Sequence, residues 1–450
     1  MSGYAEYREV YLPWLKTVPA HWEIRRNKNI FTEQKEIVGE RSADYTLLSL
    51  TLNGIIPRDM DGGGKFPESF DKYKIVKNGD MAFCLFDIDE TPRTVGLSGY
   101  NGMLTGAYTI MRVSNINARF IYYYYLALDN GKMLRPLYTG LRKIIDINTF
   151  QSTKVPVPPC EEQDQIVRFL DWKVSSINKL INIKKKEIKA IDALKRSMVS
   201  HAITRGLTTD APMKDSGVKW LGDIPAHWKI TKLRQILHPV SEKNHPEFPL
   251  LSVVREQGVI LRDVEDKEAN HNFIPDDLSG YKVVRKGQFA MNKMKAWQGS
   301  YGVSDYTGIV SPAYFIFDIA FENLEYFHYA IRSKVYVNFF AQASDGIRVG
   351  QWDLQMDKMK EIPFIVPPAD EQIAIVKYIK QALPQYDAAI EKLTEEVAVL
   401  EEYKNKVIAD AVTGKIDVRG IEIPEYEFVD EDADADNEDD GEEDTEEQED

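Results

Sequence analysis

The chain contains few of the residues on which small metal-binding or disulfide-stabilised domains depend. Only two of its 450 residues are cysteines, Cys84 and Cys160, and they form no Cys-x-x-Cys pair. The sequence therefore predicts neither a disulfide framework nor a cysteine zinc site. The seven histidines show no metal-ligand spacing. A G-x-x-x-x-G-K-[ST] loop is also missing, which argues against an ATP-driven motor in this chain.

Long apolar runs are absent as well. The sequence has no stretch of about 18 consecutive apolar residues and no signal-peptide pattern. We therefore expect a globular, cytoplasmic protein. Its length suits two or three domains, each large enough to bury a hydrophobic core.

The net charge of −15 arises at one end of the sequence. Residues 421–450 hold 18 Asp and Glu and no Lys or Arg, which leaves 53 acidic and 56 basic residues in the rest of the chain. A body so close to neutral is compatible with a local basic face, so nucleic acid stays open as a partner. We expect residues 416–450 to form a disordered acidic tail. We favour a solubilising role for it over the alternative, a polyanion that competes for a basic groove.

What the sequence does contain is a duplication of domain size. The tetrad Pro-Ala-His-Trp at residues 19–22 returns at 225–228, and Trp14 is matched by Trp220, each 206 residues later. Glu-Gln at residues 162–163 returns 209 residues later. This period is far longer than the roughly 20–50 residues of solenoid repeats. The chain therefore holds two similar units, which suit a bipartite partner.

Both units follow the same order along the sequence. A mixed region rich in β-branched and aromatic residues ends at a Pro-Pro pair, and a long helical pattern follows. We expect an α+β fold in which two pseudo-symmetric mixed α/β domains are separated by a long antiparallel two-helix coiled coil. The expected boundaries are residues 1–159 for the first domain, 160–209 for the first helix, 210–367 for the second domain and 368–415 for the second helix.

Apolar residues recur at alternating steps of four and three in both helical segments, which predicts a coiled-coil seam. Lys195 and Lys404 interrupt the seam at the same rung, and Pro384 predicts a break at which the second long helix begins. As a helix, the 28 residues 176–203 would span roughly 40 Å. One turn of B-DNA is roughly 34–36 Å long, so domains at opposite ends of such a helix could address successive faces of the major groove. The seam residues assigned to this spacer are Ile177, Ile181, Ile188, Ile191, Met198, Ile390, Leu393, Val397, Leu400 and Val407.

Together these features resemble the specificity subunit of a type I restriction–modification enzyme over nearly all of residues 14–417. The resemblance rests on Val-Pro-Ala-His-Trp at 18–22 and on residues 214–228, which end in the same tetrad. It also rests on Pro-Pro followed by Glu-Gln at 158–163 and 367–372, and on the endings at 202–204 and 411–415. None of these motifs is decisive alone, but their duplicated order is specific.

The resemblance implies a division of labour. Each mixed domain would read one half of a split DNA target, and the two helices would set the gap between the halves. Two modification subunits, which carry S-adenosylmethionine and methylate adenine, would dock on this chain. Restriction subunits that use ATP and Mg²⁺ would join them in a phage-defence complex. The chain itself would be noncatalytic and bind no cofactor.

The remaining candidates for chemistry are weak. Ser-Pro-Ala-Tyr at residues 311–314 approaches a methyltransferase motif, but without a cofactor loop we interpret it as a strand. Glu265 and Lys267 suggest a nuclease, yet no partner acid lies at a suitable offset, so we favour an exposed loop. His21 and His227 are expected to pack rather than to bind a ligand. The tyrosine-rich segments 122–125 and 326–329 are expected in the core rather than stacked on bases.

Candidate DNA-contacting residues lie where the two units differ. Residues 281–300 contain five Lys and Arg and no acid, whereas the matching residues 73–93 contain four acids, so we expect an asymmetric target. Lys and Arg attract phosphates, while Asn, Gln and Arg can bond base edges; a merely solvated basic loop is the alternative. Glycine beside Arg near residues 140–143 and 346–351 permits close approach to DNA. The residues predicted to contact DNA are Asn53, Arg58, Lys65, Arg93, Arg142, Lys143, Arg255, Gln257, Arg262, Asn292, Lys293, Lys295, Gln298, Arg348 and Gln351.

Two other functions compete with DNA readout. The first is a noncatalytic coiled-coil adaptor that assembles protein partners without reading bases. The second is a self-contained methyltransferase of altered motif, against which the missing cofactor loop argues.

Overall fold

The structure is a computed structural model that describes residues 2–58, 67, 69–138, 143–208, 210–263, 274–275, 277–348 and 351–430. For residues 347, 348 and 351 it describes the backbone alone. Lys65, Arg142, Glu265, Lys267 and the acidic residues from 431 onward lie outside the described residues.

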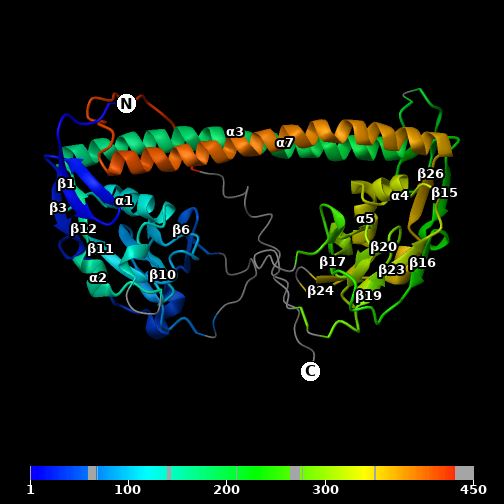
Figure 1. Cartoon of the computed structure of the whole chain (residues 1–450), viewed down its shortest axis with the longest axis horizontal. Coiled ribbons are helices and arrows are strands. Elements are labelled where there is room, and N and C mark those ends of the chain that lie inside the picture. Colours follow the sequence, from blue (N-terminus) through cyan, green and yellow to red (C-terminus); the bar gives the residue numbers. More distant parts are fainter. Residues whose placement is uncertain are drawn as a thin grey trace. The chain divides into compact units, whose positions relative to one another are not determined.

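The contacts divide the chain into two units (Figure 1). Unit 1 contains the described residues of Met1–Lys185 and Thr394–Ala435, and unit 2 contains those of Lys186–Leu393. Each unit combines one mixed α/β body with a part of each long helix, α3 (Cys160–Arg205) and α7 (Ala369–Val412). None of the helices in the described part of the chain has a stretch long and apolar enough to cross a lipid bilayer.

A four-stranded antiparallel sheet organises the body of unit 1. Its strands follow the order β4 (Phe31–Gln34), β11 (Thr109–Val113), β8 (Asp80–Phe83) and β9 (Val95–Leu97). The two-stranded sheets of this unit are β1 (Tyr7–Leu12) with β2 (Leu15–Pro19), β3 (Glu23–Arg26) with β12 (Lys154–Val157), β5 (Leu48–Thr51) with β6 (Gly54–Pro57), and β7 (Lys74–Val76) with β10 (Gly102–Leu104). The helices are α1 (Ala118–Asn130), α2 (Ile147–Ser152) and the 3-10 turns η1 (Asn27–Asn29), η2 (Gly39–Asp44) and η3 (Arg135–Leu137).

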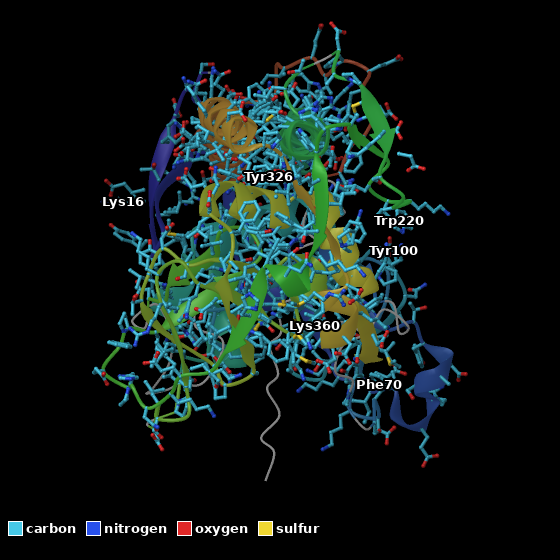
Figure 2. The ribbon with its side chains drawn as sticks, turned by 90° about the vertical axis from the view of Figure 1, so that its right-hand side faces the viewer. Lys16, Phe70, Tyr100, Trp220, Tyr326 and Lys360 are labelled. Carbon is cyan, nitrogen blue, oxygen red and sulfur yellow. The ribbon has the colours of Figure 1, made fainter. Side chains whose placement is uncertain are left out.

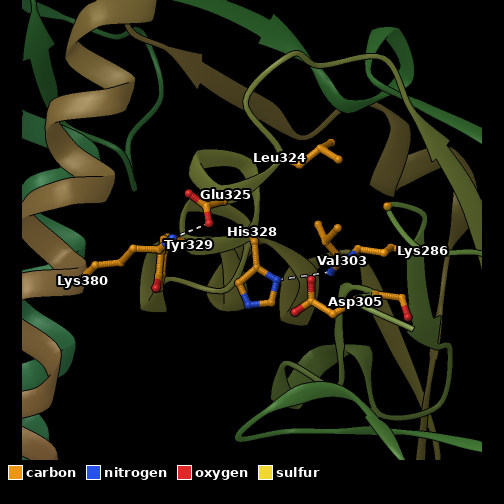
Figure 3. Close-up of a pocket in the computed structure, with 10 residues that line it drawn as sticks. Lys286, Val303, Asp305, Leu324, Glu325, His328, Tyr329 and Lys380 are labelled. Atoms are coloured by element: carbon orange, nitrogen blue, oxygen red, sulfur yellow. Dashed lines mark hydrogen bonds and ion pairs between the residues drawn. The ribbon is translucent and has the colours of Figure 1, made fainter. Parts of the chain in front are cut away.

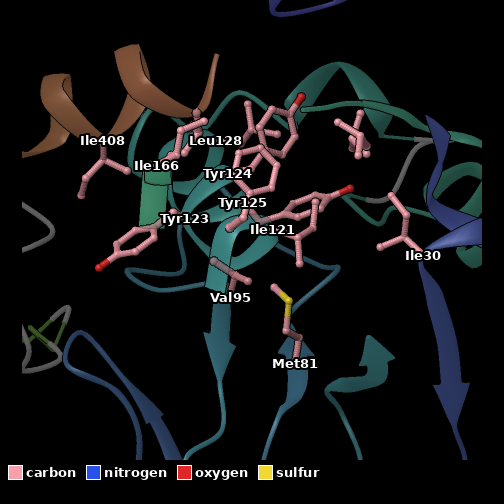
Figure 4. Close-up of a cluster of buried hydrophobic side chains, with 14 of the residues drawn as sticks. Ile30, Met81, Val95, Ile121, Tyr123, Tyr124, Tyr125, Leu128, Ile166 and Ile408 are labelled. Carbon is pink, nitrogen blue, oxygen red and sulfur yellow. The ribbon is translucent and has the colours of Figure 1, made fainter. Parts of the chain in front are cut away.

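Helix α1 fills the core of unit 1. It begins after Asn117, whose side chain accepts hydrogen bonds from the backbone N–H groups of residues 119 and 120. Tyr123, Tyr124 and Tyr125 are buried in the main hydrophobic cluster (Figure 4). The phenol of Tyr125 donates to Asn27 Oδ1 at 2.8 Å, so its polar end has a partner inside the core. Core packing of this tyrosine-rich segment is thereby confirmed.

The body of unit 2 repeats the order of the main sheet. Its strands are β16 (Leu237–Val240), β23 (Tyr314–Ile319), β20 (Phe289–Asn292) and β21 (Tyr301–Val303). The two-stranded sheets are β13 (Met213–Asp215) with β14 (Asp223–Pro225), β15 (Lys229–Lys232) with β26 (Pro363–Val366), β17 (Leu251–Val254) with β18 (Gly258–Leu261), β19 (Lys282–Val284) with β22 (Gly308–Val310), and β24 (Ser344–Arg348) with β25 (Gln351–Leu354). The helices are α4 (Leu324–Ile331), α5 (Lys334–Gln342), α6 (Met356–Lys360) and the 3-10 turns η4 (Leu233–Gln235) and η5 (Ala296–Gln298).

Local details of unit 2 agree with the sequence only in part. Tyr326 is fully buried in the interior of the unit, as expected (Figure 2). The strand expected at residues 311–314 begins only at Tyr314, because residues 311–313 form the turn between β22 and β23. The backbone N–H of Tyr314 donates to the carbonyl of Ser311 and closes this turn.

The long helices lie side by side in each unit. In unit 1, Lys404 Nζ donates to Asn178 Oδ1 at 3.3 Å and Lys184 pairs with Glu396. In unit 2, Lys195 Nζ lies 2.5 Å from Asp387 Oδ1. Residue numbers rise along α3 as they fall along α7, so the pairing is antiparallel. The two lysines expected to interrupt the seam each reach a polar side chain of the other helix.

Burial along α7 follows the apolar residues that recur at alternating steps of four and three, a ladder whose members are its rungs. Ile379, Val397, Val407 and Ala411 are buried, and the rungs at 383, 386, 390, 393, 400 and 404 are half-buried. On α3, Ile177 and Ile181 are buried, whereas the rungs at 188, 191 and 198 are half-buried. The predicted break at Pro384 is wrong. Helix α7 begins at Ala369 and continues through the proline, because the packed faces on either side hold the helix together.

Residues 416–430, expected as part of a tail, lie along α3 of unit 1. Gln165 Nε2 donates to the carbonyls of residues 418 and 421, at 3.1 and 2.8 Å. Ser175 bonds the backbone of residues 427 and 429, and Asn182 Nδ2 donates to the carbonyl of Asp430 at 2.9 Å. Polar side chains of α3 thus hold an extended segment by its backbone, which the acidic composition does not reveal.

Candidate nucleic-acid interface

Two loops occupy equivalent places in the repeated sheets. Loop A, residues 84–94, joins β8 to β9 in unit 1, and loop B, residues 293–300, joins β20 to β21 in unit 2. Glycines 79 and 287, just before β8 and β20, both have a positive φ, 88° and 89°. The flanking strands are therefore alike, whereas the loops differ in length and composition. A scaffold that repeats and a loop that varies are typical of a recognition surface.

Loop A is held by a second segment of unit 1. Asp89 Oδ1 accepts from the phenol of Tyr138 at 2.7 Å, and Asp89 Oδ2 lies 3.1 Å from Lys143 Nζ. Lys143 also pairs with Glu90. The hydrogen bond from Tyr138, followed by that from Lys143, lowers the pKa of Asp89 to about 2. Lys143, a predicted DNA contact, is therefore already bound to the acids of loop A while its side chain stays half exposed.

Arg93 lies in the interior rather than at the tip of loop A. Its side chain is 16% exposed and lies 3.0 Å from Asp129 Oδ2. The same guanidinium donates to Asn130 Oδ1 at 2.7 Å. Asp129 is almost fully buried and also accepts from Thr94. A DNA contact by Arg93 stays a prediction, and it requires the loss of this buried ion pair.

Loop B packs on the hairpin formed by β24 and β25. Lys293 Nζ lies 3.0 Å from Asp353 Oδ1, and the rings of Trp297 and Trp352 stack at 5.4 Å. The structure thus brings together two groups that the sequence singled out separately. One contains Asn292, Lys293, Lys295 and Gln298, and the other, carried by the backbones of β24 and β25, contains Arg348 and Gln351.

The acid-free stretch at residues 281–300 does not stand alone in the folded protein. Arg285 forms a bidentate ion pair with Glu242, with N–O distances of 2.7 and 3.0 Å. Lys282 Nζ donates to the carbonyl of Tyr314 at 2.6 Å, and burial lowers the pKa of this lysine. Glu242, which follows β16, therefore neutralises part of the basic character expected from the sequence.

A second pair of equivalent elements carries most of the other predicted contacts. The hairpins β5–β6 and β17–β18 expose Asn53 in one turn and Arg255 and Gln257 in the other. Arg58 and Arg262 follow the hairpins at matching positions, where their backbone N–H groups donate to the carbonyls of residues 47 and 250. These candidates come from corresponding places in the two units.

The residue that holds the second hairpin was not among those predicted from the sequence. Arg332 follows α4 and donates to the carbonyls of residues 255, 256 and 301, at 2.8, 2.7 and 2.5 Å. Burial lowers the pKa of its guanidinium. A lone arginine after a helix has no pattern from which this role can be inferred.

The repeated histidines have a role that the sequence analysis missed. His21 Nε2 lies 2.7 Å from Glu162 Oε2, and His227 Nε2 lies 2.5 Å from Glu371 Oε1. Both imidazoles also contact aromatic rings, His21 that of Tyr4 and His227 that of Trp228, so the packing agrees with the expectation and the contact with the carboxylate is the part that was not foreseen. The available signal was that both motifs, Pro-Ala-His-Trp and Glu-Gln, return with nearly the same period. Within the described ranges no group of three or more His, Cys, Asp or Glu side chains is arranged to hold a metal ion.

Comparison with known proteins gives a consistent picture. The family profile described as "Type I restriction modification DNA specificity domain" matches residues 70–190. The Type I restriction enzyme MjaVIII specificity subunit of Methanocaldococcus jannaschii is 24% identical over 433 residues, 90% of this chain and 95% of that one. The putative MjaX specificity subunit of the same organism is 23% identical over 435 residues, 89% and 95% of the two chains.

Similarity extends to solved structures. A chain described as "Structural basis underlying complex assembly and conformational transition of the type I R-M system" matches with a TM-score of 0.56 at 13% identity. The match covers 89% of this chain and 99% of that one. At this identity the likeness shows a shared fold.

Proposed function

We propose that the chain is a type I restriction–modification specificity subunit, as the matching family profile and relatives support, and that its two mixed bodies are target-recognition domains that read the two halves of one asymmetric DNA target. The proposed boundaries are those expected from the sequence, residues 1–159 and 210–367. The observation that carries this proposal is the duplicated main sheet that presents two unlike loops, A and B, at equivalent positions.

We further propose that α3 and α7 act as the spacer. Their antiparallel pairing in each unit supports a stiff element, since ion pairs join the two helices and the apolar seam positions are buried or half-buried. A stiff spacer fixes the number of unread base pairs between the half-sites. Docking of two modification subunits on this scaffold, and of restriction subunits on them, follows from the family.

Catalysis is assigned to the partners. We propose that S-adenosylmethionine, ATP and Mg²⁺ are bound by the modification and restriction subunits, and that this chain contributes sequence choice in the cytoplasm. Purified alone it is expected to bind DNA weakly and to methylate nothing. Methyl transfer by this chain alone would refute the assignment.

The proposal is tested by reconstitution. The full chain is mixed with its modification subunits and S-adenosylmethionine, and modified adenines are mapped by long-read sequencing. Substitution of Lys295 and Gln298 in loop B should change or abolish the base requirement at one half-site of the modified target. The base requirement at the other half-site should stay the same. The matched control is Lys229→Glu, an exposed lysine on β15 of the same unit. An unchanged target after the loop B substitutions would contradict base readout by this loop.

A second experiment addresses the spacer. Insertion of seven residues into both long helices keeps the alternating ladder and adds about 10 Å of helix, which corresponds to about three base pairs. The unread gap should lengthen by that amount. If modification persists with the original gap, the helices do not set it, and the rival function of a protein-assembly adaptor gains support.

A further inference from the structure

The first helix after the main sheet meets the long helix through an ion pair in unit 1. Arg119, in the first turn of α1, lies 2.7 Å from Asp171 on α3. Tyr123, one turn later, donates its phenol to the same carboxylate oxygen at 2.8 Å. Asp171 is only 13% exposed and Arg119 is 48% exposed, so the acid is the buried side of this contact.

In the equivalent contact of unit 2, the acid and the base are exchanged. Glu325, in the first turn of α4, pairs with Lys380 on α7 (Figure 3). Tyr329, one turn later, lines the same pocket of about 550 Å³ as these two residues. The body now supplies the acid and the long helix supplies the base.

The repeat shows that these positions correspond. Arg119 precedes Glu325 by 206 residues, the offset that also relates the helix-capping residues Asn117 and Asn323. Asp171 precedes Lys380 by 209 residues, the offset of the repeated Glu-Gln motif. The same two places of the fold therefore carry the same interaction with its charges exchanged.

A neighbouring position follows the same trend. In unit 1, Asn117 Nδ2 donates to Asp164 Oδ1 on α3 at 2.8 Å. The residue 209 positions later is Ile373, which is exposed on α7. The acid at this position of α3 is thus absent from α7, whereas the cation one turn later is common to both helices, Arg168 on α3 and Lys377 on α7.

We propose that the two bodies are matched to their long-helix segments by contacts of opposite charge, so that each body fits its own helix and is disfavoured on the other. With the bodies exchanged, Arg119 would face Lys380 and Glu325 would face Asp171. Like charges at both places would oppose docking, and most strongly at the little-exposed Asp171, where water screens least. The rule is independent of DNA recognition, because none of these four side chains belongs to loop A or loop B.

The test uses three variants of the full chain. The helix swap carries Asp171→Lys and Lys380→Asp, the body swap carries Arg119→Glu and Glu325→Arg, and the third variant carries all four changes. Each swap alone creates two like-charge contacts and should lower the thermal midpoint by about 2–4 °C. The fourfold variant again places opposite charges at both contacts, with acid and base exchanged between body and helix. Its thermal midpoint should therefore return most of the way to that of the parent.

Two controls isolate the charge effect. The paired changes Lys229→Asp and Asp223→Lys, at exposed positions on β15 and β14, alter the same residue types away from the α1 and α4 contacts. The recovery should also shrink when the salt concentration is raised, since about 1 M salt screens such pairs within about 3 Å. Losses that simply add in the fourfold variant, or a recovery that salt does not change, would overturn the proposal.

Discussion

Trp22 donates its indole N–H at 2.9 Å to Glu162, which lies 140 positions later in the chain. The repeat makes the same bond from Trp228 to Glu371, also at 2.9 Å. In unit 1 the carboxylate accepts in addition from Tyr4 at 2.5 Å and from His21. These bonds tie the segment before β3 to the start of the long helix.

The two carboxylates differ in their number of donors and in their exposure, so replacing each by alanine should cost a different amount of folding free energy. Glu162 is 5% exposed, whereas the side chain of Glu371 is 34% exposed. Glu162→Ala leaves the Trp22 and Tyr4 donors buried without an acceptor and should cost about 1–3 kcal/mol of folding free energy. Glu371→Ala should cost clearly less, because water can reach the donors. Urea unfolding of both variants measures the difference, and equal losses would contradict the explanation.

The stability of unit 2 should depend on His328 at mildly acidic pH. Burial, and then the neighbouring Arg332, lower the pKa of His328 from 6.5 to about 4. Its Nδ1 accepts from the backbone N–H of Val303 at 3.3 Å, which requires the neutral ring. Below pH 6.5 the unfolded chain takes up a proton that the folded chain does not, so stability falls until about pH 4 and is unaffected above about pH 7.

The expected size is about 2 kcal/mol lost between pH 7.5 and pH 5. His328→Gln keeps an acceptor for Val303 and should remove this dependence. His238→Gln, at an exposed position on β16, serves as the control and should retain it. Denaturant midpoints at the two pH values decide the matter; a His328→Gln variant with the parent's pH dependence would show that another group is responsible.

Pro384 should weaken α7 even though it does not end it. Proline cannot donate to the carbonyl one turn before it, here that of Lys380, and its ring crowds that carbonyl. Pro384→Ala is expected to stabilise the chain by about 1–3 kcal/mol. The thermal midpoint of the full chain measures this gain. A loss of stability would mean that the long helix needs a bend at this point.

Loop B should separate phosphate contacts from base contacts. Lys295→Ala should weaken binding of the assembled complex to all sequences alike and reduce the slope of log affinity against log salt by about 1. Gln298→Ala should instead reduce discrimination at one half-site by about 1–3 kcal/mol. Binding titrations at several salt concentrations, with Lys229→Ala as control, distinguish these effects. Identical behaviour of the two loop variants would argue against the assigned roles.

The features that the sequence could predict are those with a period. The heptad pattern predicts the apolar positions between Ile379 and Ala411 that are buried or half-buried, and the repeat predicts which strands correspond. A contact that occurs only once in the chain, between residues outside any repeated motif, could not be predicted. The ion pair of Lys293 with Asp353 joins residues 60 positions apart, and neither residue belongs to a repeated motif. The packed helix faces, which hold α7 together through Pro384, likewise override a local proline rule that is usually reliable.

Arg332 binds the turn at residues 255 and 256 only through carbonyl oxygens. Every amino acid supplies that atom, so the anchor places no demand on which side chains the turn carries. Substitutions there can alter what the hairpin presents to a partner without moving the hairpin itself. Evolution can therefore explore new specificities at this tip one residue at a time, while the architecture beneath it stays the same.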